Sequence, residues 1–460
     1  MITFQDLESV GDSDRERMNF VRMAIRKHQG SEDYRTAKIA DEYARHQNTT
    51  INQYRKLLYT VSGQAVPDNW SANYKIASNF FHRLITQQNQ FLLGNGASWE
   101  NEATGDRLGE DFDFRLQEAG KKALICGVSF GFFNKDHLDV FSLLEFVPLY
   151  DEENGALMAG IRFWQIDGSK PLRATLYELD GYTDYMWNIK KDGDGQILHQ
   201  KRGYLETVRR APVDTDDEAI YDYENYPSFP IIPLWANQNK QSELIGIREQ
   251  IDAYDLIKSG FANDLDDVSQ IYWTVANAGG MDDIDLAQFV QRMKTVKAAS
   301  VDDGQQVEAH SINIPYDARE VLLDRIRRDL YRDFMGLDTE TIASGAVTAT
   351  QIMASYEPIN SKADEYEYCI DEFIDKILGL IGIDDKPTFT RSYIVNKTEE
   401  TSTLIQAAEY LDKDYVTEKI LNMYGDGDKT EDMLKKMSAD EIDRGFLNRE
   451  EEEKVNNETA

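Results

Sequence analysis

The sequence lacks the features of membrane, secreted and metal-binding proteins. No run approaches about eighteen consecutive apolar residues, so we expect no membrane-spanning helix. The first residues have no basic stretch followed by an apolar one, so we expect no signal peptide. The six histidines show no metal-ligand spacing, and we expect no bound metal or other cofactor. The two cysteines, Cys126 and Cys369, lie inside helical patterns and are interpreted as buried apolar side chains in a reducing compartment.

Basic residues are scarce relative to acidic ones. The 460 residues include 50 lysines and arginines against 83 aspartates and glutamates, a formal net charge of −33. A protein that grips DNA needs a basic surface, because much of the affinity comes from neutralising phosphates. The surface as a whole would therefore repel DNA. Two interpretations stay open: the charge keeps the protein soluble, or it forms a surface that DNA passes without adhering.

Enough apolar residues are present for folded domains with real cores. They make up 41% of the chain and aromatic residues 11%, which excludes a disordered protein. The pattern predicts an α+β fold that is mainly α. Helices are predicted in the first 126 residues, followed by an antiparallel β meander with Asn-Gly and Asp-Gly turns. The predicted helices are 14–28, 31–45, 74–93 and 112–126; the predicted strands are 128–133, 140–147, 159–166, 174–178 and 185–189.

The second half of the chain is dominated by long helices. After an acidic exposed loop at 213–225 and a proline-punctuated extended stretch, helices are predicted at 242–270 and 316–335. A strand–helix–strand segment, 271–315, separates them. A flexible stretch at 337–347 leads to the longest helix, which Thr348 caps and Pro358 kinks before it ends near residue 380. The last sixty residues are predicted to be helical and acidic, with a disordered tail at 448–460.

One string resembles a catalytic motif. Residues 127–131 read Gly-Val-Ser-Phe-Gly, as in the nucleophile elbow of hydrolases. That elbow needs a strand before the serine and a helix after it, whereas here a helix precedes and strands follow. A turn from helix to strand is therefore the favoured interpretation, and a hydrolase using Ser129 is kept as an alternative. The run at 425–430 is no phosphate-binding loop, because Asp428 stands where a glycine should precede Lys429.

The helix at 316–335 concentrates arginines within an acidic chain. Asp324 and Arg328, like Arg325 and Asp329, are four residues apart, which suits ion pairs on one helix face. A salt-bridged face is the favoured interpretation; pairing between subunits or contact with a DNA backbone is the alternative. The arginines concerned are Arg319, Arg325, Arg327, Arg328 and Arg332.

The run 229–275 carries a resemblance to a known family. It has a Phe-Pro-hydrophobic-hydrophobic-Pro strand and an asparagine turn, then a helix with Ser-Glu-Leu, Asp-Ala-Tyr, Ser and Asn-Asp-Leu. It resembles the portal proteins of long-tailed bacteriophages that infect Gram-positive bacteria. The matching positions are Phe229, Pro230, Pro233, Asn237, Ser242, Glu243, Leu244, Asp252, Ala253, Tyr254, Ser259, Asn263, Asp264 and Leu265.

Three further stretches agree with this family. Residues 73–80, in a helix that ends at Gly94, resemble its early helix, and residues 127–132 with 146–151 resemble its first wing strands. Residues 344–346, shortly after 336–338, resemble the segment before its long helix. The resemblance covers roughly residues 70–385, and the order and spacing of the motifs make the set specific.

The resemblance implies the portal fold of wing, stem, clip and crown, with a ring of subunits that is dodecameric in the virion. The wing would be residues 1–241, the first stem helix 242–270, the clip 271–315 and the second stem helix 316–336. Residues 337–385 would be the tunnel loop and the long kinked helix, and 386–460 the crown and C-terminal tail. The tunnel loop facing DNA would comprise Thr339, Glu340, Thr341, Ile342, Ala343, Ser344, Gly345, Ala346 and Val347.

The resemblance also implies a structural role without catalysis. The ring would be the channel for DNA packaging and ejection at one capsid vertex, and double-stranded DNA would pass without sequence-specific binding. Partners would be the terminase large subunit, the head–tail adaptor, and the scaffolding and major capsid proteins. Terminase would supply the energy, in agreement with the absence of a phosphate loop. The protein would reside in the virion, and in the host cytoplasm during assembly, with no membrane contact.

Other function classes are kept as alternatives. A different head-completion protein would usually be much shorter and would lack two long helices around a small segment. A hydrolase would depend on Ser129. An acidic module that mimics DNA would be monomeric or dimeric and would bind a basic partner.

Overall fold

The computed structural model divides the chain into two units. Unit 1 comprises residues 1–347 and 351–392, and unit 2 comprises residues 348–350 and 393–460. Unit 2 includes helix α14 (Lys413–Tyr424). The residues that the structure describes are 2–11, 13–59, 63–68, 71–188, 195–210, 220–268, 272–276, 306–310, 316–340, 349–393 and part of 401–436.

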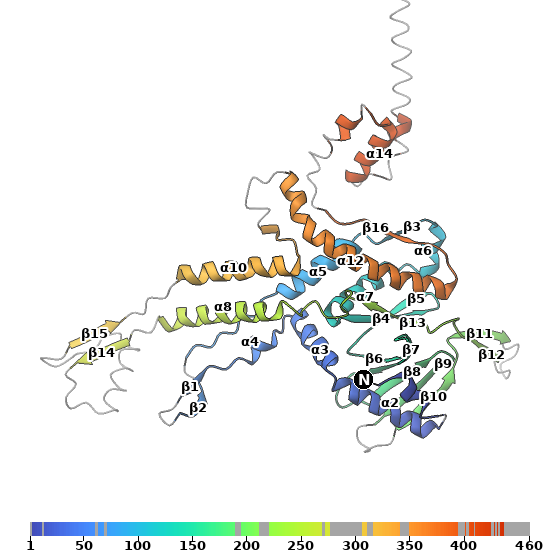
Figure 1. Ribbon diagram of the computed structural model, residues 1–460, viewed down its shortest axis with the longest axis horizontal. Helices are drawn as coiled ribbons and strands as arrows, with labels where there is room; N and C mark the ends of the chain where they lie inside the picture. Colours follow the sequence, from blue (N-terminus) through green and yellow to red (C-terminus); the bar gives the residue numbers. More distant parts are fainter. Residues whose placement is uncertain are drawn as a thin grey trace, which may run out of the picture. The chain divides into compact units, whose positions relative to one another are not determined.

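A five-stranded antiparallel sheet forms one layer of unit 1 (Figure 1). Its strands follow one another in order along the chain, so the predicted meander is confirmed from residue 146 onward, whereas the strand predicted at 128–133 belongs to a second sheet. Helices α1 (Phe4–Glu8) and α2 (Asp14–Gln29) cover one face, where Val21 and Ile25 of α2 join the core residues Ile161 and Leu176 of the sheet. The strands are β6 (Phe146–Tyr150), β7 (Leu157–Trp164), β8 (Leu172–Glu178), β9 (Gly181–Trp187) and β10 (Gly195–Arg202).

A three-stranded sheet lies between that layer and the helices. Its order is β13-β4-β5, formed by Ile231–Trp235, Val128–Asn134 and His137–Ser142. Phe130 contacts Phe146 of the larger sheet, with ring centroids 4.5 Å apart. The prediction of one continuous strand at 140–147 is wrong. Glu145 closes a turn by accepting the Ser142 N–H over 2.8 Å, so β5 and β6 enter different sheets.

Helices cover the other side of the three-stranded sheet. Gly127, with φ +88°, ends α7 in the left-handed conformation that glycine adopts without strain, so the predicted turn from helix to strand is confirmed. A side chain at Gly131 would meet the Phe373 ring at 2.4 Å, so the sheet and α12 approach closely there. The helices are α3 (Glu32–Ala44), α5 (Phe80–Leu93), α7 (Phe112–Cys126) and the bent α12 (Ala349–Ile381), in which Pro358 lies (Figure 1).

Several short elements were not predicted. The acidic segment forms a strand at 220–224, β12, which pairs with β11, so the loop prediction is wrong there. Residues 97–99 and 387–389 form a two-stranded sheet that joins distant parts of the chain. These elements are α4 (Thr49–Gln53), α6 (Glu102–Leu108), β1 (Leu57–Tyr59), β2 (Ala65–Pro67), β3 (Ala97–Trp99), β11 (Leu205–Arg210), β12 (Ile220–Glu224) and β16 (Pro387–Phe389).

Two long helices extend from this body, as predicted (Figure 1). Helix α8 (Arg248–Val268) begins later than residue 242, and Gly246, with φ +98°, precedes its first turn. Helix α10 spans Tyr316–Phe334. Between them β14 (Tyr272–Ala276) and β15 (Gln306–His310) pair antiparallel, as the two strands predicted there imply. The helix predicted between these strands lies outside the described residues. None of the helices in the described residues is long and apolar enough to cross a membrane.

Candidate functional site: the α8–α10 pair and its attachments

Helices α8 and α10 run antiparallel and contact each other. At the start of α8, Gln250 donates to Asp333 near the end of α10 over 2.6 Å. At the opposite end, Arg319 of α10 pairs with Asp264 of α8, and the rings of Phe261 and Tyr316 lie 5.6 Å apart. The two helices therefore form one continuous antiparallel arm.

Large apolar side chains on this arm remain uncovered. Val321 is 66% exposed and Leu322 is 46% exposed on α10, while Leu256 and Leu265 of α8 are 43% and 49% exposed. Burial of a fully exposed Val or Leu side chain is favourable by roughly 1.5–3 kcal/mol. These four are about half exposed, so a lone subunit leaves roughly half of that gain unused at each. The arm consequently carries surface suited to contact with another protein chain.

An extended segment attaches the N-terminal region to α8. The backbone N–H groups of Tyr74, Ile76 and Ser78 donate to the side chains of Asn263, Ser259 and Asp255, over 2.6, 2.9 and 2.8 Å respectively. Alternate residues of an extended chain point the same way, and acceptors four residues apart share one helix face. Residues 74–78 are held extended by these hydrogen bonds. The helix that was predicted to begin at residue 74 therefore begins at Phe80 instead.

The polar face of α8 has further buried partners. Asn48 donates from its side-chain amide to Asp255, which is fully buried. Burial raises the pKa of Asp255, while hydrogen bonds from Asn48 and Ser78 oppose the increase. One turn earlier, Asp252 accepts hydrogen bonds from Tyr43 and from Thr50, the latter over 2.8 Å. A stripe of polar residues on an otherwise amphipathic helix is the sequence signal for this attachment, and its role was not predicted.

A buried ion pair connects the base of the arm to α12. The Lys362 ammonium lies 2.5 Å from the Glu243 carboxylate, donates to the Phe334 carbonyl over 2.9 Å and lies 3.3 Å from the centre of the Phe334 ring. Burial lowers the pKa of Lys362, and Glu243 opposes that change. Because Phe334 ends α10 and Glu243 precedes α8, this one lysine fixes both helices at their common base.

The predicted basic residues of α10 mostly have acidic partners within the same chain. Arg319 pairs with Asp264, Arg325 with Asp329 over 3.0 Å, and Arg332 with Asp329 over 2.9 Å. Arg328 donates to the Asp324 backbone carbonyl over 3.3 Å, in place of the side-chain pair that the spacing suggested. These contacts support the salt-bridged face, and contact of any of these arginines with DNA stays a prediction.

The segment after α10 is fixed where it begins. Gln87 donates to the Leu337 carbonyl and accepts the Leu337 N–H, both over 2.9 Å. Arg327 binds Asp338 over 2.9 Å and Glu340 over 3.1 Å. These contacts attach the first four residues of 337–347, the stretch predicted to be flexible, to α5 and α10. Thr339 and Glu340 are described, whereas Thr341, Ile342, Ala343, Ser344, Gly345, Ala346 and Val347 lie outside the described residues.

The catalytic alternative has no geometric support. Ser129 is fully buried and donates its hydroxyl to the Ala119 carbonyl over 2.8 Å, so it has neither access to substrate nor a base that would activate it. Burial raises the pKa of Cys126 to about 12 and that of Cys369 to about 11, which disfavours the reactive thiolate. Within the part of the chain that the structure describes, no group of three His, Cys, Asp or Glu side chains could hold a metal ion.

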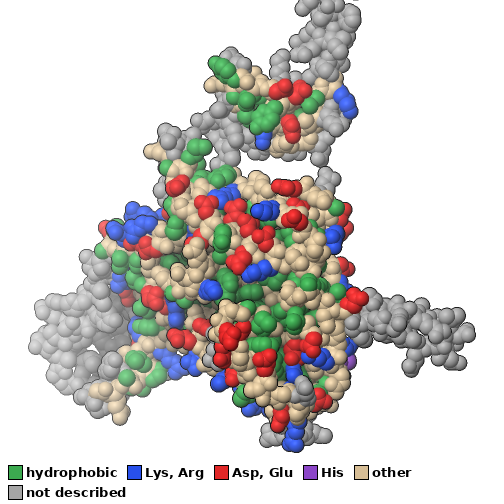
Figure 2. Space-filling model, turned by 45° about the vertical axis from the view of Figure 1, so that its right-hand side comes forward, with side chains coloured by type: hydrophobic (Ala, Val, Ile, Leu, Met, Phe, Trp, Pro, Cys, Tyr) green, Lys and Arg blue, Asp and Glu red, His purple; other side chains and the backbone are tan. Residues whose placement is uncertain are grey.

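The surface charge agrees with the composition. On the face drawn in Figure 2, acidic side chains are spread over the described residues with basic side chains among them. Tight non-specific binding of DNA would require a dense array of cations against the phosphates, whereas basic and acidic side chains are mixed on this face.

Comparison with known proteins gives consistent relatives. A portal protein of Clostridium phage phiCD119 is 24% identical in an alignment of 371 residues that covers 72% of this chain and 77% of that protein. A portal protein of Bacillus phage SPP1 is 25% identical in an alignment of 385 residues that covers 77% of this chain and 74% of that protein.

Solved structures of two particles contain similar chains. One is the neck of an empty gene transfer agent particle with C6 symmetry, with a TM-score of 0.44, 10% identity, and coverage of 75% of this chain and 90% of that one. Another is the virion of a native gene transfer agent particle, with a TM-score of 0.43, 12% identity and the same coverage.

A family model described as "Phage portal protein, SPP1 Gp6-like" matches residues 25–444, which is most of the chain. The sequence resemblance is thereby confirmed. The chain belongs to the SPP1 Gp6-like family of phage portal proteins.

Proposed function

We propose that copies of this chain form a ring, dodecameric in the virion, at one vertex of a phage capsid. The ring is the channel through which double-stranded DNA enters during packaging and leaves during ejection. It acts without catalysis of its own: the terminase large subunit supplies the energy. The scaffolding and major capsid proteins contact the ring during assembly in the host cytoplasm.

The uncovered apolar surface of the α8–α10 arm is the observation that carries this proposal. An antiparallel helix pair exposing Val321, Leu322, Leu256 and Leu265 gains stability when neighbouring copies cover these side chains. In the ring the arm is the stem that surrounds the channel. The ion pair of Lys362 with Glu243 holds each arm at a fixed angle to the rest of its subunit.

With the α8–α10 arm as the stem, the other regions of the portal fold can be assigned. Residues 1–241 form the wing, 242–270 and 316–336 the two stem helices, and 386–460 the crown and C-terminal tail. Residues 271–315 form the clip, which docks terminase first and the head–tail adaptor later. Deletion of 278–301 is expected to leave the wing folded and to abolish packaging, and normal packaging by that variant would contradict the docking role.

The acidic surface prevents DNA from stalling in the channel. Twelve copies carry roughly 400 negative formal charges in total. Screening limits their repulsion to about 10 Å at 0.1 M salt, so the effect acts only close to the wall. DNA consequently stays centred, without the many phosphate contacts that would slow its movement.

Residues 337–347 form the tunnel loop that narrows the channel. This stretch contains no lysine or arginine, so it can approach DNA without holding its phosphates. The anchors at Leu337 and Asp338 fix the start of the loop to α5 and α10. Thr341→Lys is expected to slow translocation, most strongly at low salt, because each copy would add a phosphate contact.

A cysteine in this loop tests the assignment. In a Cys369→Ser background, Ala343→Cys is expected to form crosslinks between neighbouring copies in the ring and to stop packaging when crosslinked. Phe114→Cys, which replaces a side chain that is 67% exposed on α7, is the control that should leave packaging unchanged. Unimpaired packaging after a bulky thiol reagent has fully modified position 343 would contradict the tunnel-loop assignment.

A further inference from the structure

A polar pocket of about 340 Å³ opens between the two sheets of unit 1. Strands β4 and β5 contribute one side, and strands β7 to β10 contribute the other. Its lining includes three cationic side chains, Lys135, Arg162 and Arg202, against one carboxylate, Asp139. In a chain with 83 acidic and 50 basic residues, this reversal of sign indicates a place suited to an anion.

Arg162 is the central cation of the pocket. Its guanidinium lies 4.4 Å from the centre of the Phe141 ring and 5.2 Å from that of Trp164, and it is hydrogen-bonded to the Tyr177 hydroxyl. Its Nε is buried and makes no hydrogen bond to any residue that the structure describes. Arginine is rarely buried without an acidic partner, because removing the charge from water is unfavourable. An incoming carboxylate would supply that partner.

Arg202 adds a second cation with unused donor capacity. It pairs with Asp184 over 3.3 Å and lies 5.2 Å from the centre of the Tyr182 ring, while its Nε also lacks a described hydrogen-bond partner. Asp184 already accepts hydrogen bonds from Thr175 over 2.6 Å and His199 over 3.0 Å. Together Asp139 and Asp184 supply two carboxylates against the three cations Lys135, Arg162 and Arg202, which leaves the pocket with a net positive charge.

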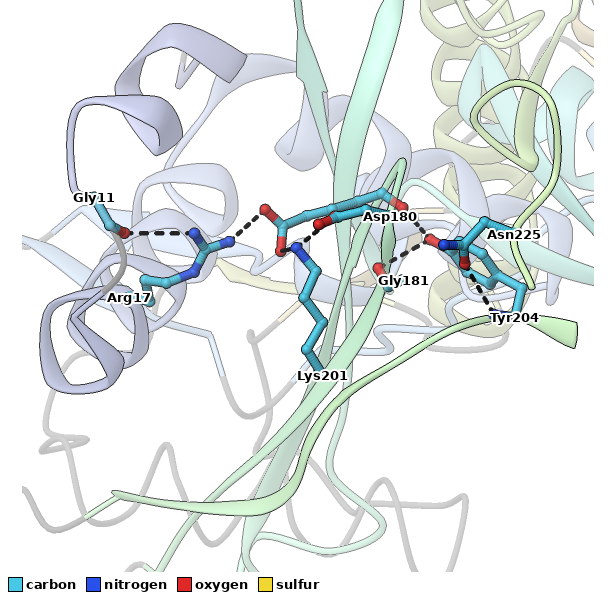
Figure 3. A network of polar contacts seen from close by, with 8 residues as sticks. Gly11, Arg17, Asp180, Gly181, Lys201, Tyr204 and Asn225 are labelled. Atoms are coloured by element: carbon cyan, nitrogen blue, oxygen red, sulfur yellow. Dashed lines mark hydrogen bonds and ion pairs between the residues drawn. The ribbon is translucent and has the colours of Figure 1, made fainter. Parts of the chain in front are cut away.

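Tyr204 lines the pocket and is held in place by polar contacts, which Figure 3 shows. Its hydroxyl donates to the backbone carbonyls of Glu178 and Gly181, and its N–H donates to the Asn225 side chain over 3.2 Å. The Glu178 carboxylate in turn pairs with Arg17 of α2 and Lys201 of β10. The strands β11 and β12 start and end at this fixed base and leave the sheets together (Figure 1).

We propose that this arginine–tyrosine pocket binds the acidic segment 211–219 of a neighbouring copy of the chain. That segment reads APVDTDDEA and contains four acidic residues and no basic one. Between Tyr204 and residue 211 the strand carries the chain roughly 20 Å away from its own pocket, at about 3.3 Å per residue. A contact between unlike surfaces of successive copies is the kind that closes a ring. The proposal rests on the proposed ring.

Peptide binding tests the recognition on its own. A fluorescent peptide of residues 211–219 is expected to bind the full chain, and a version with Asn and Gln in place of Asp and Glu is expected not to bind. Arg162→Gln should weaken binding about tenfold, because a charge-assisted contact is lost. Arg26→Gln, which removes an exposed arginine of α2, is the matched control with unchanged affinity. Equal affinity of the two peptides, or binding of inorganic phosphate without the peptide, would overturn the proposal.

Crosslinking tests the contact between copies. In a Cys126→Ala, Cys369→Ser background, a chain with Asn134→Cys at the pocket is mixed with a chain carrying Asp216→Cys, and ring formation is measured by mass photometry. We expect the rings to contain a disulfide-linked pair of chains, with twice the mass of one chain. Rings without that product, or an intrachain disulfide in a chain carrying both cysteines, would contradict the proposed contact. Neither result would contradict the proposed ring. Absence of rings would instead count against the proposed function, and the peptide measurement would still decide the pocket.

Discussion

The backbone N–H of Ile76 donates to the hydroxyl of Ser259 over 2.9 Å. This contact joins a segment near the start of the chain to a long helix that comes much later, and it is flanked by equivalent contacts to Asp255 and Asn263. Both partners lie in stretches where the sequence resembles the portal family. The family's motif on α8 is therefore explained as a set of acceptors that holds an extended strip of backbone.

Replacing Ser259 by alanine should weaken that attachment. The Ile76 N–H would lose its acceptor in a buried place, which costs roughly 1–2 kcal/mol in the free energy of unfolding. Hydrogen exchange should become faster at residues 74–78 and stay unchanged in α12. Ser355→Ala, which removes an exposed hydroxyl bonded to the Gln351 carbonyl, is the control with little effect. Equal behaviour of the two variants in chemical denaturation would contradict this role of Ser259.

Gly120 marks the closest approach of α5, α7 and α12. An added Cβ would lie 2.2 Å from the Tyr366 hydroxyl and 2.5 Å from the Asn89 side-chain oxygen, two atoms that share a buried hydrogen bond of 3.1 Å. Gly120→Ala should therefore lower the free energy of unfolding by about 2–3 kcal/mol through overpacking. Gly260→Ala on α8, where nothing lies within 4 Å, should instead raise it by up to about 1 kcal/mol. Thermal unfolding of both variants measures the contrast, and a stabilised Gly120→Ala variant would refute the close approach.

Asp371 on α12 should make stability depend on pH. Burial, and then repulsion from Glu367 and Asp375, raises the pKa of Asp371 to about 6 from its ordinary 3.8. The folded state therefore binds more protons between these values, so this group lowers stability as pH rises through that window. Asp371→Asn should raise the free energy of unfolding by about 1–2 kcal/mol at pH 7, a figure reduced for partial exposure. Urea denaturation should show that this gain in the free energy of unfolding vanishes below about pH 4. A gain independent of pH would contradict the raised pKa of Asp371.

Gln87 should control the order of the segment that follows α10. Its side-chain amide satisfies both backbone groups of Leu337, which is only 6% exposed. Gln87→Ala should release residues 337–340 and cost roughly 1–2 kcal/mol of local stability. Faster hydrogen exchange at these residues, without change at β7 or β8, would be the expected result. Unchanged exchange at 337–340 would show that Arg327 alone holds the segment.

Local signals in the sequence were sufficient for much of the fold. Helix α7 and its end at Gly127 followed from apolar spacing and a glycine that adopts φ +88°. Helix α10 followed from the same periodicity, and turn dipeptides separated the strands of the meander correctly. In each case the determining contacts lie within a few residues of one another, so they are visible in the pattern.

Contacts between distant residues account for the errors. Residues 74–79 have a helical apolar pattern. Their backbone N–H groups nevertheless donate to side chains of α8, and these hydrogen bonds keep the segment extended. The acidic residues of 220–224 form a strand because β11 offers a pairing edge. The arginine–tyrosine pocket was also missed, because Arg162 and Arg202 lie on different strands that meet only through the sheet.

The oligomeric state of the purified chain tests the central claim most directly. Negative-stain images combined with native mass measurement, taken over a range of salt concentrations, should show rings with a central channel in which the α8–α10 arms surround the axis. Val321→Glu, which places a charge on the exposed apolar surface of α10, should shift the population toward smaller species while the subunit stays folded. Only monomers of the unmodified chain under every condition would contradict the account.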